Sequence, residues 1–147
     1  MNHGEDNADT IETHTALVIG AGGGIGRALL QQWLLYPGID KVIAVSRQAP
    51  PTKHTNTGIE WIQTDYSEDA IAGICTQLKQ DGAHITRACI CNGMLHSESA
   101  WPEKRIEELN AAAMHEVFQV NAVLPMLWLK MLLPVLKGRQ TCVVAVF

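Results

Sequence analysis

The sequence has few aromatic residues, little charge and no basic cluster. Phenylalanine, tyrosine and tryptophan make up 5% of its 147 residues, and charged residues make up 18%, with a formal net charge of −4. A nucleic-acid-binding surface needs a basic patch or stripe, so the sequence predicts no nucleic-acid partner. The length and the 47% of hydrophobic residues fit one globular domain with a substantial core.

Cysteine is also scarce, and its spacing excludes two kinds of site. The four cysteines, Cys75, Cys89, Cys91 and Cys142, show neither the CxxC pairs typical of zinc sites nor the pattern of a disulfide framework. We expect the last three of them to lie in strands as small apolar side chains. The sequence therefore predicts no metal site and a reduced, cytoplasmic setting.

Long hydrophobic runs without interruption are missing. The most apolar stretch, residues 120–136, covers about 17 residues, which is the lower limit for a membrane-spanning helix. Asn121, Pro125, Lys130 and Pro134 interrupt it. We therefore predict a buried or interface helix and no membrane partner.

The N-terminal segment lacks the apolar region of a secretory signal. Residues 1–13 contain four acidic side chains and no apolar run. We predict that residues 1–13 form a mobile acidic tail and that residues 14–147 form one domain.

Glycine, by contrast, is concentrated at one place. An apolar segment that ends at Ile19 is followed by five glycines and then by a helical pattern from Arg27 onward. The glycines are Gly20, Gly22, Gly23, Gly24 and Gly26. Because glycine has no Cβ, a diphosphate can approach the main chain closely, and the positive end of the following helix attracts the anion. This order predicts a dinucleotide-phosphate site.

Apolar segments alternate with amphipathic ones along the chain, which predicts repeated βαβ units. The expected strands are residues 15–20, 41–46, 59–64, 85–91 and 141–147. The expected helices are residues 24–35, a helix capped by Ser67, a short helix near 103–109 and a long helix over 112–136 that ends at Gly138. Near-continuous apolar strands indicate a parallel sheet buried on both faces. We therefore expect a doubly wound α/β sheet in the order 3-2-1-4-5, with a ligand crevice at the carboxyl ends of the first and fourth strands.

The glycine spacing resembles that of the short-chain dehydrogenase/reductase superfamily, whose pattern is Thr-Gly-x-x-x-Gly-Ile-Gly. Gly20, Gly24, Ile25 and Gly26 match it, whereas Ile19 replaces the threonine. The resemblance implies a Rossmann-like fold and hydride transfer between a nicotinamide coenzyme and a small carbonyl or alcohol substrate. It also implies that the segment Gly20, Gly22, Gly23, Gly24, Ile25 and Gly26 binds the coenzyme.

The second strand is followed by Ser46-Arg47 rather than by an acidic residue. A carboxylate here would bind the ribose diol of NAD and repel a 2′-phosphate, whereas a guanidinium can bind that phosphate with paired hydrogen bonds. The sequence therefore favours NADP(H) over NAD(H). The alternative is that Arg47 is only a solvated residue at a strand end.

The third strand is followed by Asp65-Tyr66. The resemblance implies that the Asp65 carboxylate accepts a hydrogen bond from the adenine amino group and that the backbone of Tyr66 contacts the base. The alternative is that Asp65 only helps to cap the next helix, and the two roles are compatible.

The fourth strand ends in Ile90-Cys91-Asn92-Gly93, where the family has Asn-Asn-Ala-Gly. Gly93 matches, Asn92 stands in the alanine position and both family asparagines are replaced. The resemblance implies that Asn92 and Gly93 line the nicotinamide-ribose side of the site, with backbone rather than side-chain contacts.

The long helix contains Asn121-Ala-Val-Leu-Pro125, which resembles the family segment Asn-Val-x-Gly-Pro. Pro125 has no N–H, so the carbonyl of Asn121 loses its helical donor. The resemblance implies a catalytic role for Asn121, whose carbonyl binds a water in a proton relay. The alternative is that Asn121 only satisfies a helix kink.

The family's catalytic Tyr-x-x-x-Lys is missing from these 147 residues. The two tyrosines, Tyr36 and Tyr66, are followed four positions later by Asp40 and Ala70. We therefore expect the chain to carry the coenzyme-binding half of the family fold and to be inactive alone. Because the long helix 112–136 is apolar nearly all round and the resemblance implies that part of it is buried between subunits, we also expect a homo-oligomer through this helix.

Two other functions remain open on the sequence. One is a non-catalytic dinucleotide-binding or sensor protein. The other is an S-adenosylmethionine methyltransferase, because Gly20-x-Gly22-x-Gly24 also fits the spacing of that class. Such enzymes usually carry an acidic residue two positions before the first glycine, where this chain has Val18, so this alternative ranks low.

Overall fold

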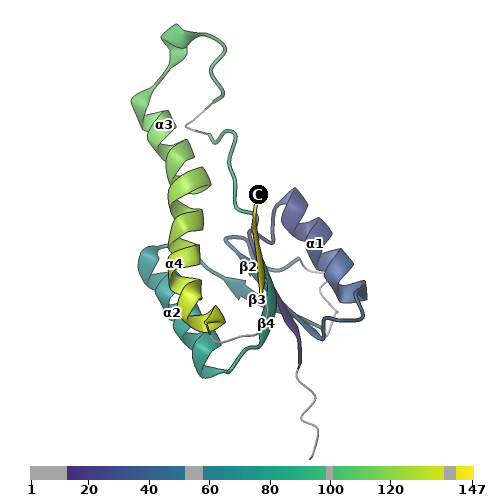
Figure 1. Ribbon diagram of the computed structural model, residues 1–147. Helices are drawn as coiled ribbons and strands as arrows, with labels where there is room; N and C mark the ends of the chain where they lie inside the picture. Colours follow the sequence, from purple (N-terminus) through teal and green to yellow (C-terminus); the bar gives the residue numbers. More distant parts are fainter. Residues whose placement is uncertain (1–12, 52–57, 99–100, 138–141) are drawn as a thin grey trace, which may run out of the picture.

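Five parallel strands form one sheet in the order β3-β2-β1-β4-β5 (Figure 1). The computed structural model describes residues 13–51, 58–98, 101–137 and 142–147. The strands are β1 (Thr15–Ile19), β2 (Lys41–Ser46), β3 (Ile59–Gln63), β4 (Ile85–Ile90) and β5 (Val143–Val146). The expected doubly wound sheet and its strand order are confirmed. The tail residues 1–12 and Gly138 lie outside the described residues.

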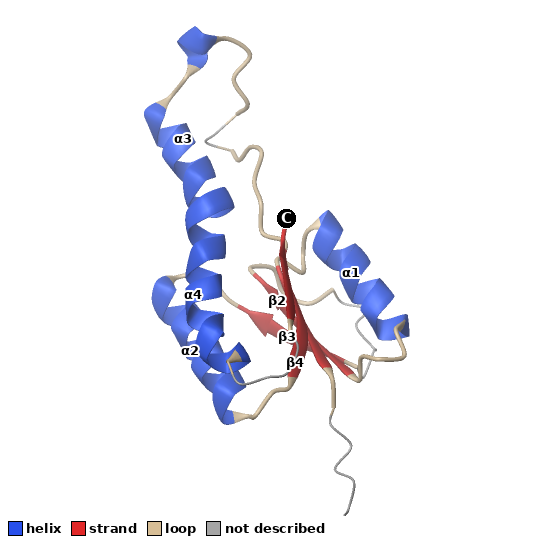
Figure 2. Ribbon diagram, in the orientation of Figure 1, coloured by secondary structure: helices blue, strands red, loops and turns tan. Residues whose placement is uncertain are grey.

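Helices cover both faces of the sheet (Figure 2). Helix α1 (Gly24–Leu35) lies on one face, and α2 (Glu68–Gln80) and α4 (Leu124–Leu136) lie on the other. Successive residues of a strand point to opposite faces, so Leu17 and Ile19 of β1 join the core under α2 and α4 while Ala16 and Val18 face α1. Every residue of β1 is buried, as expected for a strand that is covered on both sides.

Helix α2 begins as its sequence predicts. The Ser67 side chain accepts a hydrogen bond from the backbone N–H of Ala70 at 3.3 Å. Glu68 and Asp69 lie in the first turn, where negative charge is favourable because the N-terminus of a helix is positive.

Several predicted boundaries need correction. Strand β4 ends at Ile90 and β5 begins at Val143, so of the three cysteines expected in strands only Cys89 lies in one. Strands β1 and β3 each end one residue earlier than expected. The short helix expected near 103–109 is a single 3₁₀ turn, η1 (Ile106–Glu108).

The long helix is continuous but opens in its middle. Helix α3 (Ala111–Phe118) passes into a π-helical segment, η2 (Gln119–Val123), and then into α4. Within the opening, the N–H of Leu124 donates to the carbonyl of Gln119, five residues back. The next residue, Pro125, has no N–H, so the regular helical pattern cannot continue through this point.

By length and composition, the combined helix Ala111–Leu136 could cross a membrane. A core helix can have the same composition. In α4 the side chains of Leu124, Trp128, Leu132 and Val135 are buried in the core beside β1 and α2. The α4 part is therefore a core helix on one side, whereas α3 and η2 have no buried residues.

Candidate functional site

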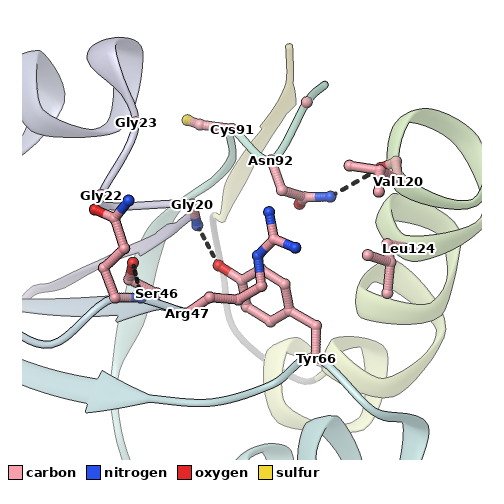
Figure 3. A pocket seen from close by; sticks show the side chains of 12 residues that line it. Gly20, Gly22, Gly23, Ser46, Arg47, Tyr66, Cys91, Asn92, Val120 and Leu124 are labelled. Carbon is pink, nitrogen blue, oxygen red and sulfur yellow. Dashed lines mark hydrogen bonds between the residues drawn. The ribbon is translucent and has the colours of Figure 1, made fainter. Parts of the chain in front are cut away.

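A pocket of about 160 Å³ lies at the carboxyl ends of β1, β2 and β4 (Figure 3). This is the expected position for a ligand in a doubly wound sheet. The loops after four strands and the opened part of the long helix contribute to it. Its lining residues are Gly20, Gly22, Gly23, Ser46, Arg47, Gln48, Tyr66, Cys91, Asn92, Gly93, Val120 and Leu124.

The structure brings most of the predicted coenzyme-binding residues together here. Five of the predicted residues do not line the pocket: Gly24, Ile25, Gly26, Asp65 and Asn121. Sequence reasoning missed four lining residues: Gln48, Cys91, Val120 and Leu124. Val120 and Leu124 could have been placed together from the sequence, because they lie four positions apart in the predicted long helix and residues so spaced share a face.

Two glycines of the loop, Gly20 and Gly26, are required because a Cβ at either would meet backbone atoms, whereas one at Gly22 would meet side-chain atoms. Gly20 has φ +82°, and a Cβ there would lie 2.7 Å from the backbone nitrogen of Asn92. A Cβ on Gly22 would lie 2.7 Å from Ser46 Oγ, and a Cβ on Gly26 would overlap the carbonyl oxygen of Gly20. The turn is held against β2 by hydrogen bonds from the N–H groups of Gly20 and Ala21 to the carbonyl of Val45, at 2.9 and 3.0 Å.

Gly24 is different, because no protein atom occupies the space in front of it. A Cβ on Gly24 would meet nothing within 4 Å. The helix that starts there has Gly23 as its N-cap, without a side-chain hydrogen bond to its first N–H groups. Those N–H groups and the open space above them suit an anion such as a diphosphate.

Tyr66 forms the floor of the pocket in a strained backbone conformation. Its φ is +63°, which is rare for a residue other than glycine. The buried hydroxyl donates to the carbonyl of Val45 at 3.2 Å and accepts from the N–H of Gly20 at 3.1 Å. The ring meets Trp128 edge-on, with centroids 6.0 Å apart. Tyr66 therefore ties the glycine turn to β2, a side-chain role that the sequence did not predict.

Burial raises the pKa of the Tyr66 hydroxyl above its ordinary value. The hydroxyl stays protonated at neutral pH and can keep donating to Val45. The pKa of the Cys91 thiol is also raised, to about 12, by burial and by the neighbouring Cys89. Cys91 therefore lines the pocket as a protonated thiol at neutral pH.

Arg47 supplies the positive charge of the pocket. Figure 3 shows its side chain lying across the pocket above Tyr66. Ser46 beside it is buried, and its Oγ accepts from the N–H of Gln48 at 3.1 Å. None of the lining residues is Asp or Glu. The pocket can therefore receive an anion without meeting a carboxylate.

Asp65 lies outside the pocket, and its side chain helps to cap the start of α2. One of its carboxylate oxygens accepts from the N–H of Ser67 at 2.9 Å. Hydrogen bonds from Ser67 lower the pKa of this exposed carboxyl group. The structure thus provides the capping role that was the alternative for Asp65.

Asn121 binds a neighbouring loop through its side chain. Its Oδ1 accepts from the N–H of Met94 at 2.7 Å, and its Nδ2 donates to the carbonyl of Met94 at 2.8 Å. This pair of bonds fastens the segment after β4, which includes Gly93, to the opened helix. The proton-relay role of the Asn121 carbonyl stays a prediction.

Comparisons with known proteins agree with this architecture. The sequence profile of the KR domain matches residues 14–124. No curated protein matches the chain. Many solved structures share the fold, among them the following three at low identity. A short-chain dehydrogenase from Leptospira borgpetersenii with bound NAD⁺ is 20% identical, with a TM-score of 0.77 and coverage of 92% of this chain and 51% of its own.

The other two structures match this chain over a similar share of its length. ElxO with NADP bound is 13% identical, with a TM-score of 0.76 and coverage of 92% of this chain and 55% of its own. Carbonyl reductase Sniffer of D. melanogaster is 17% identical, with a TM-score of 0.69 and coverage of 86% of this chain and 53% of its own. This chain thus spans little more than half the length of each.

Proposed function

The chain belongs to the KR-domain family of short-chain dehydrogenases/reductases, and on that premise we propose that it binds NADP(H) as the coenzyme-binding part of an oxidoreductase. The reaction would transfer hydride between the nicotinamide and the carbonyl or alcohol carbon of a small molecule. One observation carries the proposal: a glycine turn and an uncapped helix N-terminus adjoin a pocket that holds Arg47 and no carboxylate. Family membership leaves the methyltransferase alternative without support.

The residues present fit an adenine dinucleotide. The open space at Gly24 and the N–H groups of α1 suit the diphosphate. Arg47 suits a 2′-phosphate, because a guanidinium can form paired hydrogen bonds with it. Among structural relatives, one contains NAD⁺ and another NADP, so the preference for NADP(H) rests on Arg47.

The bound coenzyme supplies or accepts hydride at its nicotinamide ring, and the residues of this chain orient it. Tyr66 fixes the turn at Gly20, and Asn121 fixes the loop at Met94. The water-binding role of the Asn121 carbonyl belongs to the same proposal.

We expect the 147-residue chain to bind coenzyme without turnover. A positioned acid or base contributes about 10²–10⁴-fold to rate, and no Tyr-x-x-x-Lys is present in these residues. Calorimetry with NADP⁺ and NAD⁺ tests binding, and NADPH consumption with a panel of aldehydes and ketones tests turnover. No heat and no rise in melting temperature with either coenzyme would overturn the proposal. Steady carbonyl reduction would refute the expected inactivity.

A non-catalytic dinucleotide-binding protein is the second candidate, since the pocket and glycine turn would serve binding alone equally well. The two candidates predict different turnover for a longer protein, in which any coding sequence after Phe147 is expressed together with this chain. Turnover by that longer protein supports the oxidoreductase. Coenzyme binding without turnover supports the sensor.

We also propose a homo-oligomer in a reduced, cytoplasmic setting. The long helix exposes apolar side chains at Met114, Phe118, Met126 and Leu133, which a second copy could cover. All four cysteines are free. Light scattering should give at least the mass of a dimer, and a monodisperse monomer would contradict this.

A further inference from the structure

The glycine turn after β1 has no hydrogen-bonding side chain of its own. Residues 19–26 are isoleucine, alanine and glycine throughout. Such a segment has many accessible conformations, and fixing one of them costs conformational entropy. Within the part of the chain that the structure describes, one side chain forms a hydrogen bond with the backbone of residues 20–26, and it is that of Tyr66.

The Tyr66 hydroxyl joins both partners of the backbone bond that anchors the turn to β2. It accepts from the N–H of Gly20 at 3.1 Å and donates to the carbonyl of Val45 at 3.2 Å (Figure 3). The same N–H and carbonyl also bond to each other directly, at 2.9 Å. A hydroxyl suits this place because it can donate and accept at once.

Gly20 passes this constraint on to the start of α1. Its carbonyl accepts from the N–H of Gly23 at 3.1 Å, and Gly23 is the N-cap of α1. On its other side, Gly20 packs against the backbone of Asn92, whose Nδ2 donates to the carbonyl of Val120 at 3.1 Å. The turn is therefore held by packing on the β4 side, and the hydroxyl acts on the β2 side.

Tyr66 is itself held in place from several directions. Its N–H donates to Thr64 Oγ1 at 3.2 Å, its ring meets Trp128 edge-on, and the residue is only 7% exposed. These contacts hold a backbone with φ +63°. Strained residues persist only where their surroundings fix them in this way, and they cluster at ligand sites.

We propose that the Tyr66 hydroxyl is a positioning group for the diphosphate of the coenzyme. By holding Gly20, it keeps the N–H groups at the start of α1 in the arrangement that binds the anion. This inference rests on the proposed function, which puts the diphosphate there. The family resemblance assigns only a backbone contact to this position, so the role of the hydroxyl is additional. Because NADP(H) and NAD(H) share the diphosphate, the hydroxyl should support both equally.

The test removes the hydroxyl alone, in Tyr66→Phe, which keeps the ring beside Trp128. Calorimetry on the 147-residue chain should show NADP⁺ and NAD⁺ both binding about 3- to 10-fold more weakly, the effect of one lost hydrogen bond, with an unchanged ratio. Adenosine 2′-monophosphate, which has no diphosphate, should bind the variant and wild type alike in NMR shift titrations, which reach millimolar dissociation constants. Tyr36→Phe is the matched control. Tyr36 is 53% exposed at the C-terminal end of α1, so this variant should bind all three ligands as wild type does.

The outcomes separate this inference from the proposed function. If wild type binds neither coenzyme, the proposed function fails. If wild type binds them and Tyr66→Phe binds them as tightly, coenzyme binding stands and the role of the hydroxyl is refuted. An equal loss for adenosine 2′-monophosphate also refutes it, because the effect would not be specific to the diphosphate. Should Tyr66→Phe not fold, Tyr66→Asn tolerates the positive φ and also lacks the hydroxyl. An equal loss for both coenzymes is again expected, and an unequal one overturns the proposal.

Discussion

Gly26→Ala is expected to destabilise the domain by about 3 kcal/mol or more, the upper range for overpacking a core. A Cβ at this position would overlap the carbonyl oxygen of Gly20 and lie 2.8 Å from the Cα of Ala21. Both are backbone atoms of the turn after β1, and Gly20 is fixed in turn against the backbone of Asn92 and Cys91. No side chain can rotate to relieve the contact. Urea unfolding followed by circular dichroism measures the loss.

Gly24→Ala is the matched control in the same loop. A Cβ there meets nothing within 4 Å, and replacing glycine by alanine where the backbone tolerates it stabilises a protein by about 0.4–1 kcal/mol. Its unfolding midpoint should equal or exceed that of wild type, whereas its coenzyme affinity should fall because the methyl group enters the space proposed for the diphosphate. Equal midpoints for Gly26→Ala and wild type would show that the turn can move.

The fold could be predicted almost completely from the sequence, because its signals are local. The glycine turn, the apolar strands and the Ser67 cap each depend on residues a few positions apart. Their order along the chain then limits the topology, since parallel strands need right-handed crossovers. The order 3-2-1-4-5 is confirmed, but local features alone do not fix it, because other doubly wound orders satisfy the same crossover rule.

The site could be predicted only in part, because some of its contacts join residues far apart in the chain. Nothing near Tyr66 in the sequence indicates that its hydroxyl reaches Gly20 and Val45. Likewise, the link between Asn92 and Val120 depends on how the helix opens before Pro125. The family resemblance assigns an adenine contact to Asp65, and the capping role that the sequence also offered is present, because one carboxylate oxygen accepts from the N–H of Ser67.

Arg47→Ala is expected to weaken NADP⁺ binding by about 10- to 100-fold, the effect of losing a charge-assisted hydrogen bond to a phosphate. Its affinity for NAD⁺ should change little, because NAD⁺ has no 2′-phosphate for the guanidinium to bind. Arg47 is exposed at the end of β2, so its removal should leave the unfolding midpoint within about 0.5 kcal/mol of wild type. Calorimetric titrations of both coenzymes give the ratio directly.

Two comparisons make this result specific to Arg47. Arg105→Ala removes an exposed arginine beside η1, outside the pocket lining, and should leave both affinities as they are. Raising the salt concentration should weaken NADP⁺ binding more than NAD⁺ binding in wild type, since the extra phosphate is bound through charge. In Arg47→Ala the two coenzymes should respond to salt more nearly alike. If Arg47→Ala instead weakens NAD⁺ and NADP⁺ equally, the guanidinium binds a part that both share, and the selectivity for NADP(H) must be abandoned.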